Sequence, residues 1–207
     1  MLNIAVLVSG GGTNLQALID AKSEGRIKNG DIKLVISGNK NAFALKRAED
    51  AGIKTAVFER KSFKDIKEHN TAMIEELKSY DIDLIVLAGY LSILGREFTE
   101  KYKNMIINVH PSLIPSFCGD GFYGLKVHEA ALLKGVKVTG ATVHFVNEVT
   151  DGGPIILQKA VEVKSGDTPE LLQKRVMRSA EWELLPRAVS LFCDGRIKVD
   201  GNKVIIL

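Results

Sequence analysis

Residues 2–19, LNIAVLVSGGGTNLQALI, contain a strand, a turn and the start of a helix. Residues 2–8 are almost entirely apolar and are typical of a buried strand. Residues 9–14 supply three consecutive glycines, and apolar residues recur at helical spacing from Leu15 onward. Glycines let backbone amides approach a ligand, and a helix N-terminus favours an anion. The stretch predicts a βα unit whose turn could hold a phosphate, although a turn that binds nothing is also compatible with it.

The rest of the chain continues this alternation. We expect strands at 32–36, 55–58, 84–87 and 106–110, helices at about 42–51, 63–80, 125–133 and 169–188, an antiparallel pair of strands at 140–146 and 154–163, and a terminal hairpin turning at Asp200-Gly201. The pattern predicts an α/β fold with a doubly wound, mostly parallel sheet, a Rossmann-like N-terminal half and an antiparallel C-terminal extension.

No repeat, linker or low-complexity tract divides the 207 residues, so we expect a single domain over 1–207. Its first half, about 1–100, carries the glycine turn, and its second half, about 101–207, carries the remaining candidate chemistry.

Residues 106–115, IINVHPSLIP, place two polar side chains at the end of a buried strand. Asn108 and His110 are two residues apart and should face the same side. An amide can donate to a developing oxyanion, and an imidazole can move a proton near neutral pH. The pair is a candidate catalytic site, and an incidental histidine at a capped strand end is the alternative.

Two loops could enclose such a site. Residues 88–94, AGYLSIL, form an apolar loop after the expected strand 84–87 and could line a pocket for a flat ring. Residues 116–124, with three glycines and three aromatics, could cover the site or simply connect two elements.

The composition narrows the class of protein and of partner. Hydrophobic residues make up 45% and charged residues 26%, the formal net charge is only +3, and no apolar run could span a bilayer. We therefore expect small-molecule substrates, no nucleic-acid partner, no membrane, and a monomer or weak homodimer. Cys118 and Cys193 have neither metal-ligand nor disulfide spacing, which indicates a cytoplasmic location.

Five blocks together resemble the folate-dependent formyltransferases of the phosphoribosylglycinamide formyltransferase family. They are SGGGTNLQA (9–17), LAGY (87–90), NVHPSLIP (108–115), GATVHFV (140–146) and DGGPII (151–156), and they extend over nearly the whole chain. The block that begins at Asn108 is shared with other enzymes that use 10-formyltetrahydrofolate. The glycine turn with Thr13-Asn14 narrows the resemblance to those enzymes whose substrate is glycinamide ribonucleotide.

The resemblance implies transfer of a formyl group from 10-formyltetrahydrofolate, as co-substrate, to the amine of glycinamide ribonucleotide, without a metal or a covalent enzyme intermediate. It assigns catalysis to Asn108, His110 and Asp151, although Asp151 by itself could be an ordinary turn aspartate. Asn108 would stabilise the oxyanion and His110 would donate or relay a proton. Asp151 would favour the imidazolium and raise the pKa of His110.

The resemblance also implies binding residues. The phosphate and ribose site maps onto Gly12, Thr13, Asn14 and Glu181. The folate pocket maps onto Leu91, Ser92, Ile93, Leu94, Asn108, Asn147, Glu148, Val149, Thr150 and Asp151.

Four features depart from the family pattern. One additional residue lies between Arg175 and Pro186, which affects the placement of Glu181. The 116–124 loop is longer than usual, and Thr150 replaces a larger apolar residue. The basic residue that meets the folate tail in the family has no clear counterpart near Ile66, where Lys64 and Lys67 are the available substitutes.

Two groups of rival functions remain. A transfer-RNA formyltransferase or a formyl-folate hydrolase normally has an extra domain, for which we expect no room here. A dinucleotide-dependent protein in which His110 has no catalytic role is opposed by the missing third fingerprint glycine and by Ser37-Gly38-Asn39, where an acidic residue would end the second strand.

Overall fold

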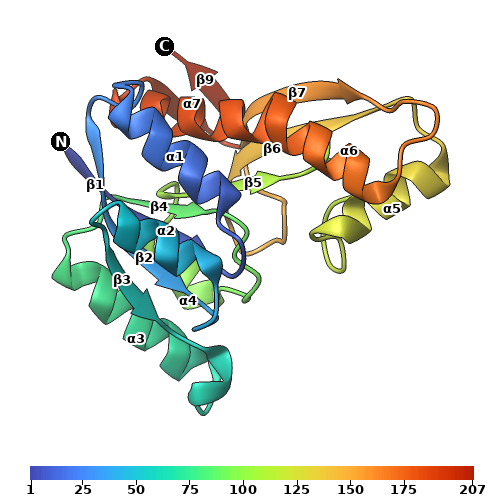
Figure 1. The fold of residues 1–207 in the computed structure, drawn as a ribbon. Coiled ribbons are helices and arrows are strands. Elements are labelled where there is room, and N and C mark those ends of the chain that lie inside the picture. The colour runs from blue at the N-terminus through green and yellow to red at the C-terminus, as the bar shows by residue number, and fades with distance from the viewer.

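A computed structural model describes all residues, 1–207. Its main feature is a seven-stranded sheet with the order β3-β2-β1-β4-β5-β6-β7 (Figure 1). The strands are β1 Leu2–Val8, β2 Gly30–Ser37, β3 Lys54–Val57, β4 Leu84–Leu87, β5 Ile106–His110, β6 Val138–Phe145 and β7 Ile155–Glu162. The first five are parallel, and β6 and β7 are antiparallel to their neighbours. The predicted mixed sheet is confirmed.

Helices cover both faces of the sheet, as alternation along β1 requires. Ile4, Val6 and Val8 pack with the helices on one face, and Ala5 and Leu7 pack on the other. The first face carries α1 Thr13–Ser23, α2 Phe43–Asp50, α5 Leu125–Lys134, α6 Pro169–Val176 and α7 Trp182–Cys193. The second carries α3 Ile66–Ser79 and α4 Arg96–Lys101. Burial on both faces explains why the central strands β4 and β1, the latter from Ile4 onward, are continuous apolar runs.

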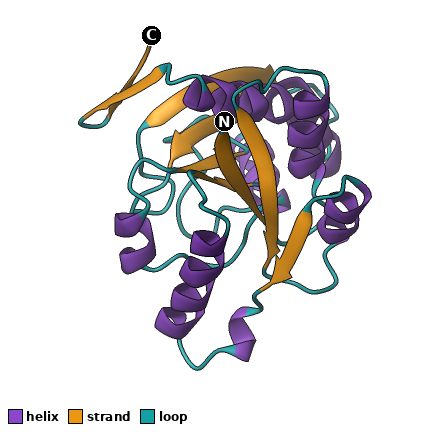
Figure 2. Cartoon of the chain, turned by 90° about the vertical axis from the view of Figure 1, so that its left-hand side faces the viewer, coloured by secondary structure: helices purple, strands orange, loops and turns teal.

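The C-terminal hairpin lies outside this sheet. Strands β8 Ile197–Asp200 and β9 Lys203–Ile206 pair only with each other, which confirms the predicted hairpin. Its turn is Gly201-Asn202, one residue beyond the predicted Asp200-Gly201, because Asp200 still pairs with Lys203. Figure 2 shows this hairpin projecting from the body of the molecule.

Some elements differ from the sequence-based expectation. Helix α4 and a 3₁₀ turn, η1 Arg60–Ser62, were not predicted. The expected helix 169–188 runs to Cys193 and is interrupted by one π-helical turn, η2 Met177–Glu181. No helix has both the length and the apolar composition needed to cross a membrane.

Strand register brings the candidate site together. Leu7 of β1 pairs with Leu87 of β4, and Leu87 pairs with Asn108 of β5. The glycine turn, the 88–94 loop and the end of β5 therefore share one edge of the sheet. Two strand spacings, about 10 Å, separate β1 from β5 at this level.

Candidate active site

The glycine turn between β1 and α1 leaves its backbone donors free. Gly12 is in the left-handed conformation, with φ of 71°, and α1 begins at Thr13. The backbone N–H groups of residues 10–14 donate to no acceptor in the protein. Because unpaired N–H groups at a helix N-terminus form a site for an anion, the turn retains the phosphate-binding capacity predicted from its sequence.

Asn14 and Glu181 meet beside this turn. The Asn14 Nδ2 donates to Glu181 Oε2 at 2.7 Å, inside the protein. The Asn14 Oδ1 is buried without a partner. Burial raises the pKa of Glu181 to about 7, although the Asn14 hydrogen bond opposes the shift. The two residues assigned to one ligand are thus neighbours, and both have polar atoms available next to the turn.

The π turn accounts for the additional residue before Pro186. A π turn accommodates one more residue than an α-helical turn, and such turns often occur at functional sites. Glu181 is the last residue of η2, where its side chain reaches Asn14 of α1. A turn of this kind can accommodate the extra residue within the helix, in the segment that ends at Glu181.

Asn108 and His110 lie on β5 and face a common cluster, as predicted from their spacing. The Asn108 Nδ2 is 3.2 Å from Nε2 of His144, its partner in the β5–β6 pairing. His110 is buried, with its Nε2 2.8 Å from the carbonyl oxygen of Phe117 and its Nδ1 3.4 Å from Asp151 Oδ2. The amide, imidazole and carboxylate predicted as catalytic are therefore connected in one cluster.

Asp151 is held at the centre of the cluster by residues from three segments. Its Oδ2 accepts from the Gly119 N–H at 2.9 Å, and its Oδ1 lies 3.6 Å from His144 Nε2. Burial pushes the pKa of Asp151 upward, but His144, His110 and the Gly119 N–H together hold it below its ordinary value. Asp151 is therefore a carboxylate at neutral pH.

The electrostatic balance at His110 differs from the expectation. Burial lowers the pKa of His110, while the charge of Asp151 and the Phe117 carbonyl raise it, and the net shift is downward. Asp151 thus acts in the expected direction, but the cost of removing the imidazolium from water is larger. His110 is mainly neutral at pH 7.

His144 was not assigned a role from the sequence, although it lies in the 140–146 block. It is buried, and its Nδ1 is 2.8 Å from the Phe145 carbonyl oxygen. A carbonyl requires a donor, so Nδ1 carries hydrogen, and the tautomer with hydrogen on Nδ1 alone presents an acceptor at Nε2. One N–H of the Asn108 amide can donate to that acceptor, and the other remains available. The antiparallel pairing of β5 with β6 was the signal that could have identified His144.

The 116–124 loop contributes backbone groups to the cluster. Phe117 supplies the carbonyl beside His110 and Gly119 supplies the N–H beside Asp151. The loop is also tied to the 147–151 segment, because the Thr150 hydroxyl donates to Asp120 at 2.9 Å. Cys118 is partly buried, and burial raises the pKa of its thiol, which makes it a poor nucleophile.

The residues assigned to the folate pocket lie in two loops, and several are unusually exposed for apolar side chains. Leu91 is 63%, Ile93 77% and Val149 59% exposed. Exposed apolar side chains on the loops that flank the site offer surface that a ligand could cover. Leu94 and Ser92 are half-buried.

These two loops are attached to neighbouring elements. The Leu91 N–H donates to Ser9 Oγ at 2.9 Å, which joins the 88–94 loop to the glycine turn. Glu148 lies 3.5 Å from Arg96 of α4, and Asn147 accepts from the Val149 N–H. Each loop is therefore tied to a neighbouring element, the 88–94 loop to the glycine turn and the 147–151 loop to α4.

A cavity of about 650 Å³ opens beside Asp151. It is lined by residues from the β5–α5 connection, the 150–155 segment and the β8–β9 hairpin, including Pro115, Cys118, Asp151 and Lys203. Asp151 therefore has access to a space large enough for part of a small ligand.

Comparison with known proteins agrees with the arrangement. Residues 2–189 match the formyl transferase family. The chain is 42% identical to phosphoribosylglycinamide formyltransferase of Haemophilus influenzae over 98% of its own length and 92% of that protein. It is 44% identical to the human trifunctional purine biosynthetic protein adenosine-3 over 96% of its length, but spans only 19% of that relative.

A solved structure gives the same result. The fold superimposes with a TM-score of 0.94 on glycinamide ribonucleotide transformylase 1 from Symbiobacterium toebii, with 42% identity, 100% coverage of this chain and 94% of the other. The chain therefore belongs to the formyl transferase family, within the group of the phosphoribosylglycinamide formyltransferases.

Proposed function

We propose that the protein transfers the formyl group of 10-formyltetrahydrofolate to the primary amine of 5-phosphoribosylglycinamide, a step of de novo purine biosynthesis. One observation carries the proposal. A turn with free backbone N–H groups lies on the same sheet edge as the cluster of Asn108, His110 and Asp151. Family membership supports the reaction class.

The ribonucleotide would be held at its phosphate and at its ribose. The N–H groups of Gly12, Thr13 and Asn14 would bind the phosphate, assisted by the dipole of α1. Glu181 lies beside Asn14 and would accept from a ribose hydroxyl. A phosphate anchored at the turn would place the amine about 10 Å away, near the end of β5.

Asn108 would stabilise the charge that forms when the amine attacks the formyl carbon. One Asn108 N–H is directed at His144, which leaves the second N–H for the tetrahedral oxyanion. Because the amide is already oriented by His144, little reorganisation is needed as the charge develops. Loss of such a donor typically costs about 10²–10³ in rate.

His110 would carry the proton that the reaction moves from the attacking amine to the leaving folate nitrogen. A neutral ring can accept this proton, and Asp151 beside Nδ1 then stabilises the imidazolium. The Phe117 carbonyl accepts from the Nε2–H of His110, so it would have to withdraw, and the ring hydrogen would have to shift to Nδ1 beside Asp151, before Nε2 could take a proton from the substrate. Movement of the 116–124 loop would then be part of the catalytic cycle.

The folate would occupy the apolar loops. Leu91, Ile93 and Val149 expose apolar surface that a flat ring could cover, and the remaining residues of the 91–94 and 147–151 loops would enclose it. The polar edge of the ring would face Asn108 and Asp151. This orientation would bring the reactive folate nitrogen to the catalytic cluster.

The test combines the enzyme assay with two variants. Purified protein should convert 5-phosphoribosylglycinamide and 10-formyltetrahydrofolate to the formylated product. His110→Ala and Asp151→Asn should lose turnover while still binding the ribonucleotide in calorimetry. Asp31→Asn is the matched control, because Asp31 is paired with Lys33 on β2 and far from the cluster in the sheet. Full activity in both site variants would refute the proposal.

A further inference from the structure

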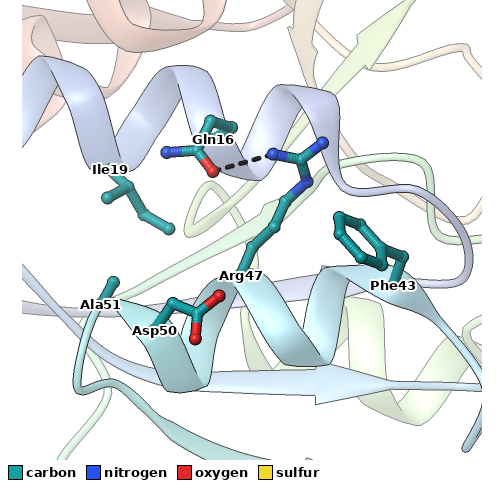
Figure 3. Close-up of a pocket in the computed structure, with 6 residues that line it drawn as sticks. All are labelled: Gln16, Ile19, Phe43, Arg47, Asp50 and Ala51. Atoms are coloured by element: carbon teal, nitrogen blue, oxygen red, sulfur yellow. Dashed lines mark hydrogen bonds between the residues drawn. The ribbon is translucent and has the colours of Figure 1, made fainter.

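Arg47 of α2 contacts the glycine turn, although neither it nor its helix belongs to the proposed binding set. Its Nε donates to the Gly11 carbonyl at 2.9 Å, and one terminal nitrogen donates to Gln16 Oε1 at 3.0 Å. Its guanidinium lies 5.0 Å from the centre of the Phe43 ring. Figure 3 shows Arg47 reaching from α2 toward Gln16 of α1, beside Phe43. Two hydrogen bonds and a ring contact fix the orientation of the guanidinium.

Helix α2 restrains each of the three glycines by a different contact. The Ala44 N–H donates to the Gly10 carbonyl at 3.1 Å, and Arg47 holds the Gly11 carbonyl. Gly12 packs directly on Ala44, since a Cβ at Gly12 would lie 2.6 Å from the Ala44 Cβ. A Cβ at Gly10 or Gly11 would have no neighbour within 4 Å, so their carbonyl contacts provide the main restraint.

This restraint matters because three glycines in sequence have a large conformational entropy. With the carbonyls of Gly10 and Gly11 engaged by α2, the N–H groups of the turn are left for an anion. A ligand that binds a turn already in the bound conformation does not have to order it. The Arg47 charge also lies one peptide group away from the site, where it favours an anion without needing to touch it.

We propose that Arg47 is a positioning residue that holds the glycine turn in its phosphate-binding conformation and thereby sets the affinity for the phosphate-bearing substrate. The inference rests on the proposed phosphate site. It assigns Arg47 no part in formyl transfer or in folate binding.

The test uses two substitutions that keep the long side chain. Arg47→Met retains the apolar stem but removes the donors and the charge. Arg47→Lys retains the charge but cannot donate in two directions from one plane. Lys46→Met is the matched control, because Lys46 is exposed on the same helix and pairs with Asp50.

Steady-state kinetics and phosphate titration should separate positioning from general damage. We expect KM for 5-phosphoribosylglycinamide to rise about tenfold in both Arg47 variants, equivalent to ~1.4 kcal/mol, with kcat and the folate KM nearly unchanged. The Kd of inorganic phosphate, measured by calorimetry, should weaken by a similar factor. The kcat/KM of the phosphate-free riboside should not change, and Lys46→Met should match the parent protein.

Three results would overturn the inference. They are an unchanged ribonucleotide KM, an equal loss with the riboside, and a Lys variant that behaves like the parent protein. If the parent protein forms no formylated product, the proposed function fails, but the phosphate titration still decides the role of Arg47. A parent protein that binds no phosphate would refute both the site and this role.

Discussion

The Nδ1 of His110 lies 3.4 Å from the Oδ2 of Asp151, and both groups are largely buried. Burial lowers the pKa of this histidine more than the neighbouring carboxylate raises it. The imidazole is therefore neutral at rest but has a partner ready to stabilise its charged form. That combination suits a group that must both accept a proton and release it.

Asp151→Asn should lower the pKa of His110 further, because it removes the charge that favours the imidazolium. Turnover should fall, because the weaker base accepts the amine proton less readily. The deficit should be smaller at pH 5.5 than at pH 7.5, because acid protonates the ring of the parent protein more than the ring of the variant, whose pKa is lower. NMR titration of the histidine ring resonances gives the pKa directly. An unchanged or raised pKa in the variant would contradict this electrostatic account.

Asn108→Ala should reduce kcat by about 10²–10³ with little change in either KM, because the amide acts mainly on the oxyanion. Steady-state kinetics on the folded variant checks this. A loss confined to KM would instead make Asn108 a binding residue.

Glu181→Gln should change how stability depends on pH. The folded pKa of Glu181, about 7, is above its unfolded value, so the parent protein binds more protons when folded and loses stability as pH rises from about 4.5 to 7. A glutamine does not ionise, and its stability relative to the parent protein should therefore improve across this range. Urea unfolding at pH 5 and pH 8 measures the difference in unfolding free energy between the variant and the parent protein. The same difference at both pH values would contradict the raised pKa.

Gly12→Ala should destabilise the protein by about 1–3 kcal/mol. Residue 12 has a positive φ, and the Cβ added by the substitution would lie only 2.6 Å from the Ala44 Cβ. Gly11→Ala is the control, since Gly11 does not have a positive φ and a Cβ added there would have no neighbour within 4 Å. Thermal unfolding of both variants should separate them. Equal stability would show that α2 does not pack closely on the turn.

Local sequence patterns predicted the strands, the glycine turn and the shared face of Asn108 and His110, since each depends on a period or a short motif. Helix α4 has only six residues, two of them buried, which is too short for a periodic signal. The π turn at 177–181 has no composition of its own. It was indicated only by the one-residue surplus before Pro186.

The centre of the site was less predictable. Asp151 was assigned from the family resemblance, because an aspartate before two glycines is ordinary turn sequence. Phe117 and Gly119 contribute a backbone carbonyl and a backbone N–H. Nearly every residue has these groups, so the identity of the side chain does not indicate that a residue belongs to the site. The net pKa of His110 depends on its burial, which only the folded structure provides.

The fate of a labelled formyl group tests the central claim most directly. We would incubate the protein with 10-formyltetrahydrofolate carrying ¹³C in the formyl group and follow the carbon by NMR, with and without 5-phosphoribosylglycinamide. Formyl transfer predicts that the label moves to the amide of the ribonucleotide and stays on the folate when the ribonucleotide is omitted. Release of labelled formate without the ribonucleotide, or no transfer in its presence, would contradict the account.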